Sequence, residues 1–259
     1  MRMSSIESRQ SRRRLAAALT ISISIAIAIG SCAIFAARVY AGAADIPASV
    51  DQYASALDAI MKSHSRQSLQ PVFEIGIQSS PEVQAILDTL SESDFAALQK
   101  KMPGMQILRG KSEVVRPSAD FFRNLARRKG AKADRAFFDI YARTEPDSSP
   151  DFPAYVSVQS PSARCTRFDG PLLVALYRGW LDFRTQYPGD YTTEAQGELD
   201  SMDAELSAGT CACGTEQQVA DGLAEFAKAF PDLPMTTKVR ARIDRIKAGT
   251  SHIRFQCHG

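Results

Sequence analysis

Apolar residues recur at steps of three and four along most of the chain, which is the spacing of an amphipathic helix. The clearest example begins at Pro171 and places the only tryptophan at the centre of one apolar stripe. The stripe consists of Leu173, Leu176, Tyr177, Trp180, Phe183 and Tyr187. Such a stripe is typical of a helix that packs into a core and predicts a buried face here.

Capping residues and helix-stop signals predict five further helices. Their starts or ranges are Ser80-Pro81, Ser118, 131–143, Thr215 with Gln218 as a capping box, and 236–247. The first of these would have Val83, Ile86 and Leu90 on its apolar face, with Pro81 at the first helical position. The helix from Ser118 is expected to end before Gly130, because basic residues followed by glycine are a common helix terminus.

Signals for β-strands are sparse. Three short stretches show some alternation of apolar and polar residues, over 71–78, 154–159 and 251–257. A proline-rich segment, 145–153, interrupts the helical pattern, because proline lacks the amide hydrogen that a helix interior needs. The sequence therefore predicts a mainly α protein, a helical bundle-like body with few short strands. Its two regions, 44–145 and 154–259, are either separate or packed as one domain.

Residues 1–43 have the pattern of an export signal or a membrane anchor. Residues 15–37 carry no charge and follow a cluster of arginines. A helix of this length reaches about 34 Å, enough to cross a hydrocarbon core of roughly 30 Å. Three outcomes remain open: cleavage after Ala43, lipid attachment at Cys32, or retention as an anchor. In each, we expect the body to be periplasmic or secreted, with membrane contact confined to 15–37.

The net charge of +2 belongs to the N-terminal segment. Residues before position 44 carry a net charge of +5, so residues 44–259 carry −3. A mildly acidic body has no electrostatic footprint for nucleic acid, and we expect no such partner. Acidic residues gather between Thr185 and Ala227, whereas the predicted helix over 236–247 is basic. We expect this acidic segment to pack against the basic helix rather than to form a cation site, because no calcium-loop motif is present.

The body contains four cysteines, and all of them lie after the proline-rich segment: Cys165, Cys211, Cys213 and Cys257. In an oxidising compartment, an even number predicts two disulfides in the C-terminal half. A direct Cys211–Cys213 bond would close a very tight ring, so we expect each of these to pair with Cys165 or Cys257. The alternative is a metal site formed by Cys211, Cys213, Cys257 and His258, although a Cys-x-Cys step is shorter than the usual ligand spacing.

Common catalytic motifs are absent: the chain has three histidines and neither a Gly-x-Ser-x-Gly nor a His-Glu-x-x-His sequence. Glu92-Ser93 resembles the Glu-Ser pair of lytic transglycosylases, although the Gly-Leu-Met-Gln stretch of that family is missing. If the chain were a glycan hydrolase, Glu74 and Glu92 would be its nominal acids. Glu92 is also expected in the first turn of a helix after Ser91, where a carboxylate interacts favourably with the helix dipole.

The sequence favours a non-enzymatic protein of the cell envelope or the secreted fraction. We expect a binding or structural role toward an envelope protein or a cell-wall component, without a cofactor. Two alternatives are an exported hydrolase that acts on cell-wall glycan and a periplasmic protein that binds metal through the Cys/His cluster.

Overall fold

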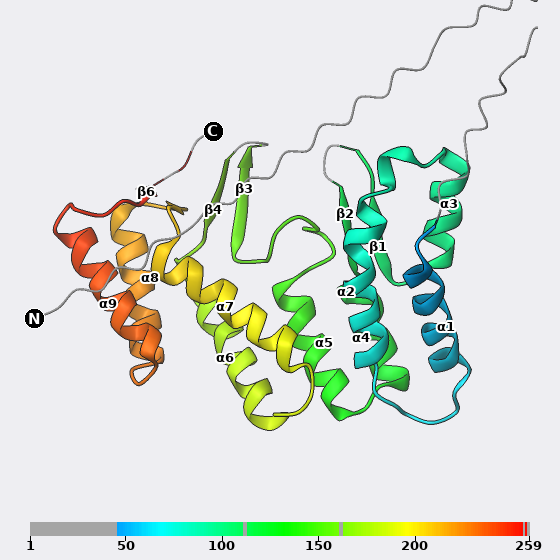
Figure 1. The fold of residues 1–259 in the computed structure, drawn as a ribbon. Coiled ribbons are helices and arrows are strands. Elements are labelled where there is room, and N and C mark those ends of the chain that lie inside the picture. Colours follow the sequence, from blue (N-terminus) through cyan, green and yellow to red (C-terminus); the bar gives the residue numbers. More distant parts are fainter. Residues whose placement is uncertain (1–45, 111–112, 161–162, 256, 258–259) are drawn as a thin grey trace, which may run out of the picture. The chain divides into compact units, whose positions relative to one another are not determined.

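The computed structural model describes residues 46–110, 113–160, 163–255 and 257, and these residues belong to one compact unit (Figure 1). They form a mainly helical fold. The α-helices are α1 Ala48–Lys62, α2 Gln70–Gln84, α3 Glu92–Lys101, α4 Ala119–Lys129, α5 Lys132–Thr144, α6 Leu172–Gln186, α7 Thr192–Ala208, α8 Glu216–Ala229 and α9 Pro234–Lys247. A short 3-10 helix, η1 Leu87–Thr89, lies between α2 and α3. Helices that are neighbours in sequence pack in pairs, α1 with α2, α4 with α5, α6 with α7 and α8 with α9.

Two small sheets accompany the helices. Their strands are β1 Met105–Leu108, β2 Val114–Pro117, β3 Val156–Ser160, β4 Ala163–Thr166, β5 Cys211–Ala212 and β6 Arg254–Phe255. Strands β1 and β2 form an antiparallel hairpin. The second sheet has the order β3-β4-β5-β6, in which β3 and β4 are antiparallel and the two later pairings are parallel. Because β5 and β6 are only two residues long, few backbone hydrogen bonds hold them in the sheet.

Aromatic side chains from five segments form the centre of the core. The Phe73 ring lies between 5.1 and 5.9 Å, centroid to centroid, from five other rings in edge-to-face contacts: Phe122, Phe137, Phe138, Tyr141 and Tyr191. Trp180 is fully buried and donates a hydrogen bond from Nε1 to Thr144 Oγ1 at 3.0 Å. The apolar stripe of α6 therefore faces the core, as its spacing predicted.

The buried carboxylate of Asp134 joins the beginnings of three helices. It accepts hydrogen bonds from the backbone amides of Leu69 at 2.9 Å and Ala131 at 2.6 Å, which precede α2 and α5. It also accepts one from the Tyr191 hydroxyl at 2.6 Å, immediately before α7. Tyr191 has a left-handed backbone conformation, with φ of 48°. The Asp134 contacts hold this unfavourable conformation in place.

Several predicted helix ends are confirmed. Ser118 caps α4 by accepting a hydrogen bond from the Phe121 amide, and α4 ends at Lys129 before Gly130. Thr215 and Gln218 form a capping box at the start of α8. A Cβ atom at Gly130 would lie 2.8 Å from Ala126 Cα, so glycine is needed there for close packing rather than for a positive φ.

Two predictions around residue 80 are wrong. Pro81 does not begin a helix but lies in the last turn of α2, and 71–78 is part of that helix rather than a strand. The buried positions of α2 recur at helical spacing and include Val72, Phe73, Gly76 and Val83. Packing of this face compensates for the hydrogen bond that Pro81 cannot donate. Of the other two strand stretches, 154–159 overlaps β3, whereas 251–257 contains only the two residues of β6.

The predicted export segment lies outside the described residues, as do Cys32 and Ala43. Within the part of the chain that is described, no helix is long and apolar enough to span a membrane.

Candidate functional site

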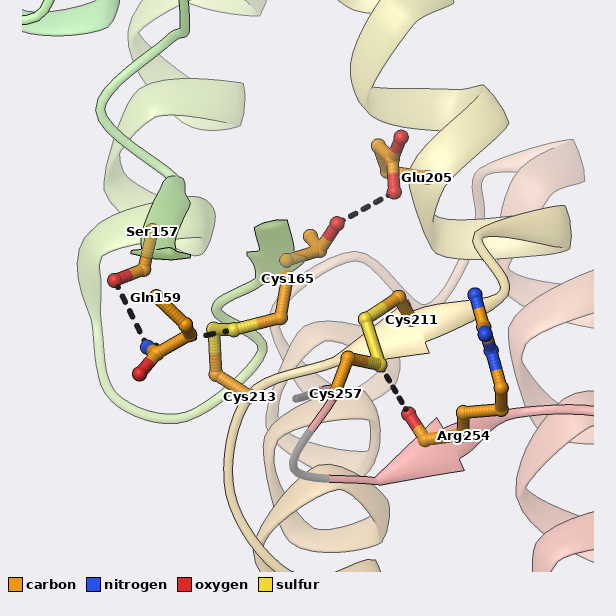
Figure 2. Close-up of a disulfide and its surroundings, with 9 residues drawn as sticks. Ser157, Gln159, Cys165, Glu205, Cys211, Cys213, Arg254 and Cys257 are labelled. Carbon is orange, nitrogen blue, oxygen red and sulfur yellow. Dashed lines mark hydrogen bonds between the residues drawn. A yellow bond between two sulfur atoms is a disulfide. The ribbon is translucent and has the colours of Figure 1, made fainter. Parts of the chain in front are cut away.

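Two disulfides bind the strands of the second sheet together (Figure 2). Cys165 pairs with Cys213 and joins β4 to the residue after β5, with a Cα–Cα distance of 5.0 Å. Cys211 pairs with Cys257 and joins β5 to the tail after β6, with a Cα–Cα distance of 6.0 Å. The expected cross-pairing of the Cys-x-Cys step is therefore found. These covalent bonds hold the short strands where few backbone hydrogen bonds are available.

The alternative metal site loses its thiolate ligands in this oxidised form, because all three cysteine sulfurs belong to disulfides. His258, its fourth member, lies outside the described residues. No group of three or more metal-binding side chains comes together within the described ranges.

A cleft of about 640 Å³ lies beside the disulfides, and we call it the α7 cleft. It is lined by one side of α7, the end of α5, the segment 152–155 before β3, the β3–β4 hairpin and the start of β5. The lining residues are Glu145, Phe152, Pro153, Tyr155, Val156, Arg164, Cys165, Thr166, Glu198, Ser201, Ala204, Glu205, Thr210 and Cys211. Both disulfides contribute a sulfur-bearing residue to its wall.

Helix α7 brings two carboxylates to the cleft because of its periodicity. Glu198, Ser201 and Glu205 are separated by steps of three and four, so they share one face. The apolar residues of the helix, among them Leu199 and Met202, are buried on another face. The core therefore sets the rotation of α7, and that rotation directs Glu198 and Glu205 toward the cleft.

Glu145 lies at the end of α5 and forms an ion pair with Arg116, with an Nη1–Oε2 distance of 2.8 Å. Arg116 also donates to Gln106 Oε1 at 2.9 Å and to the Pro146 carbonyl at 2.9 Å. Burial raises the pKa of Glu145, and Arg116 opposes that rise. The proline-rich segment is thus attached to the β1–β2 hairpin through a guanidinium group.

Burial raises the pKa of Glu198 to about 8, with a further rise from the nearby Glu145 carboxylate and an opposing contribution from Arg116. Glu198 is therefore mostly protonated at neutral pH when the cleft holds no cation. Glu205 differs in that its Oε2 accepts a hydrogen bond from Thr166 Oγ1 at 2.6 Å. The two carboxyl groups on the same helix face have different local environments.

Tyr155 contributes a nearly inaccessible side chain to the cleft wall. Its side chain is only 2% exposed. Burial raises its pKa, and the three cleft carboxylates Glu198, Glu145 and Glu205 raise it further. Its hydroxyl makes no hydrogen bond within the described residues, and its oxygen is not one of the fully buried unpaired side-chain atoms found there, which are Arg123 Nε and Glu194 Oε2. A polar group of a ligand or a water molecule in the cleft would satisfy it.

Arg242 on α9 fixes the end of α7. Its guanidinium group is buried and donates to the backbone carbonyl of Leu206 at 2.8 Å and to those of Glu205 and Gly209. Burial lowers the Arg242 pKa to about 10, and Glu205 opposes this change. The expected packing of the acidic helix α7 against the basic helix α9 is found, but the contact uses carbonyl groups of α7 rather than its carboxylates.

The two nominal acids of the hydrolase hypothesis do not line the α7 cleft. Glu92 lies in the first turn of α3, as expected, where it is 89% exposed and contacts Arg109. Glu74 accepts a hydrogen bond from Gln70 Nε2 at 2.7 Å within α2. Glu92 and Ser93, which resemble the lytic transglycosylase pair, thus lie at the exposed start of α3, and Ser91 caps this helix.

The acidic residues of α7 stand out in the sequence, but the sequence did not identify one site made of Glu145, Glu198, Glu205 and Tyr155. The seven-residue spacing of Glu198 and Glu205 is a signal that could have identified their common face. No sequence signal places Glu145 in the same cleft, because its position depends on how α5 packs against α6 and how α6 packs against α7.

Comparison of the chain with protein-family models, with curated proteins and with solved structures found no match.

Proposed function

We propose that this is an exported, disulfide-stabilised binding protein that holds a cationic small molecule in the α7 cleft. The observation that carries the proposal is the Tyr155 side chain, which is 2% exposed, makes no hydroxyl hydrogen bond within the described residues and lies in a wall shared with three carboxylates. An ionised carboxylate accepts hydrogen bonds only, and a tyrosine hydroxyl both donates and accepts. Such a set suits a ligand that carries positively charged hydrogen-bond donors.

The size and composition of the cleft support a small molecule. A volume of about 640 Å³ falls within the range of roughly 300–1,000 Å³ that is usual for ligand pockets. Apolar atoms of Phe152, Pro153 and Val156 accompany the polar groups. The disulfides support export, because such bonds persist in oxidising compartments.

The binding test uses isothermal titration calorimetry on the disulfide-bonded protein at a pH above the Glu198 pKa of about 8, where this side chain is ionised. We expect an alkylamine to bind, and the carboxylate and alcohol of the same chain length not to bind. Glu198→Gln should weaken amine binding at least tenfold, since it removes the charge but keeps the shape. Asp200→Asn is the matched control, because it removes an exposed charge from the same helix outside the cleft. Equal binding of all three compounds, or an unchanged Glu198→Gln, would contradict the proposal.

A hydrolytic function is the second candidate, and the raised pKa of Glu198 favours it. A protonated glutamate beside a second carboxylate, Glu145, is the arrangement that glycosidases use for a general acid and its partner. This version replaces Glu74 and Glu92 by two cleft residues. It predicts that purified protein releases reducing ends from cell-wall glycan, and that Glu198→Gln abolishes this release. Absence of any release by the wild-type protein would exclude it.

A further inference from the structure

We infer that the α7 cleft selects an elongated organic dication, such as an α,ω-diamine, through Glu198 and Glu205 acting as two separate anionic ends. The inference rests on the proposed cation-binding function and specifies the chemical class of the ligand. It follows from the spacing of these carboxylates, from the charges around them and from the side chains between them.

The two carboxylates occupy the same face of one helix, α7. Seven residues of an α-helix rise by about 10.5 Å and return to nearly the same side of the helix. Glu198 and Glu205 both line the cleft, so one lies two helical turns further along it than the other. A ligand that lies along this face of the helix and reaches both residues therefore has charged groups about 10 Å apart.

Protein cations leave these two carboxylates without an ion pair. Arg116 pairs with Glu145, the third acid of the cleft, at 2.8 Å. Within the described residues, no lysine or arginine nitrogen lies within 4.0 Å of a carboxylate oxygen of Glu198 or Glu205. Arg242 lies near Glu205 but donates to backbone carbonyls.

Arg164 is the basic residue of the cleft lining, and it contacts an aromatic ring rather than either carboxylate. Its guanidinium carbon lies 5.2 Å from the centroid of the Phe152 ring, a cation–π distance. Two negative ends therefore remain available to a ligand at a pH where Glu198 is ionised.

The stretch between the two ends suits an apolar linker. Ser201 and Ala204 are the lining residues of α7 between Glu198 and Glu205, and both are small. The Ser201 hydroxyl already donates to the Gly197 carbonyl at 2.9 Å, so it does not demand a polar partner from the ligand. The Tyr155 side chain also lines the cleft, and its hydroxyl, which makes no hydrogen bond within the described residues, is an additional acceptor for an ammonium group, independent of the two carboxylates. A methylene chain with an ammonium group at each end fits these requirements.

The test compares three amines by calorimetry with the full disulfide-bonded protein, at low salt and at a pH above the Glu198 pKa of about 8. The seven-carbon α,ω-diamine, whose extended length matches the helical rise between positions 198 and 205, should bind at least tenfold more tightly than the four-carbon α,ω-diamine and the seven-carbon monoamine. Glu198→Gln and Glu205→Gln should each reduce the affinity for the long diamine to that for the monoamine. Glutamine at 205 can still accept the Thr166 hydrogen bond, so the cleft wall should persist, and circular dichroism checks that both variants fold.

The outcomes separate this inference from the proposed function. If the monoamine and the long diamine bind equally, and both depend on Glu198, the protein binds cations but the dication inference is wrong. If the long diamine binds tightly and Glu205→Gln has no effect, the second anionic end is not Glu205 and the inference is likewise wrong. If none of the amines binds, both the proposed function and the inference fail. Asp200→Asn should behave as wild type in every titration.

Discussion

The Asp134–Tyr191 contact offers a sharp test of what holds the helices together. Tyr191→Phe removes one buried hydrogen bond of 2.6 Å to a carboxylate and leaves the ring in its stack with Phe137, whose centroid lies 3.8 Å away. A hydrogen bond to a charged group contributes about 1.5–3 kcal/mol. We therefore expect Tyr191→Phe to lower the free energy of unfolding by about 2 kcal/mol.

Asp134→Asn has a different effect on the same group of contacts. The asparagine oxygen can replace Oδ1, which accepts from Leu69 and Tyr191, but its NH₂ group faces the Ala131 amide, which donates to Oδ2. Two donors then face each other in a buried site. The expected loss is about 2–4 kcal/mol, since a buried amide without an acceptor pays its desolvation penalty in full. The substitutions share a contact, so their effects should not add.

Urea denaturation followed by circular dichroism measures both single variants and the double variant. Tyr187→Phe is the matched control, because this half-buried tyrosine makes no hydroxyl hydrogen bond within the described residues. It should change the free energy of unfolding by less than about 0.5 kcal/mol. If Tyr191→Phe is equally neutral, or if the two substitutions add without coupling, the contact does not join the helices as described.

Three further predictions concern the cleft and its supports. The pKa of Glu198 is raised to about 8, so the folded state favours its protonated form. The stability of the wild-type protein should therefore fall relative to that of Glu198→Gln as the pH rises from about 4.5 through 8. A difference in urea midpoint that does not depend on pH would contradict this. Replacing Cys165 and Cys213 by alanine opens a loop with a sequence separation of 48 and should lower the free energy of unfolding by about 4 kcal/mol under non-reducing conditions, whereas a loss below about 1 kcal/mol would refute this estimate. Arg242→Met leaves buried carbonyls of α7 without donors and should be destabilising by about 2–4 kcal/mol in urea denaturation, while Arg240→Met, exposed on the same helix, should be nearly neutral.

Much of the secondary structure follows from local chemistry. The caps at Ser118 and Thr215 and the stripe around Trp180 involve residues within a few positions of each other, so their effects can be read along the chain. The errors at 71–78 and Pro81 have the opposite origin. There, a buried face that packs against distant aromatic rings decides the conformation, and the local proline signal is outweighed.

The cysteines illustrate how far sequence reasoning extends. Their even number and the short Cys-x-Cys step predicted two disulfides with crossed partners, but both crossed pairings remained open. The choice of Cys165 with Cys213 depends on the order of β4, β5 and β6 in the sheet. That order arises from contacts between strands far apart in the chain.

The sequence by itself determined that this protein is mainly helical, that its body is acidic and that its C-terminal half is cross-linked. These properties depend on periodicity, composition and residue counts, which need no knowledge of distant contacts. Only the tertiary structure decided that Glu145, Tyr155, Glu198 and Glu205 line one cleft. The core sets the rotation of α7 and the position of the end of α5. Carboxylates that are far apart in sequence line one cleft because the burial of apolar side chains outweighs the cost of bringing the acidic groups together.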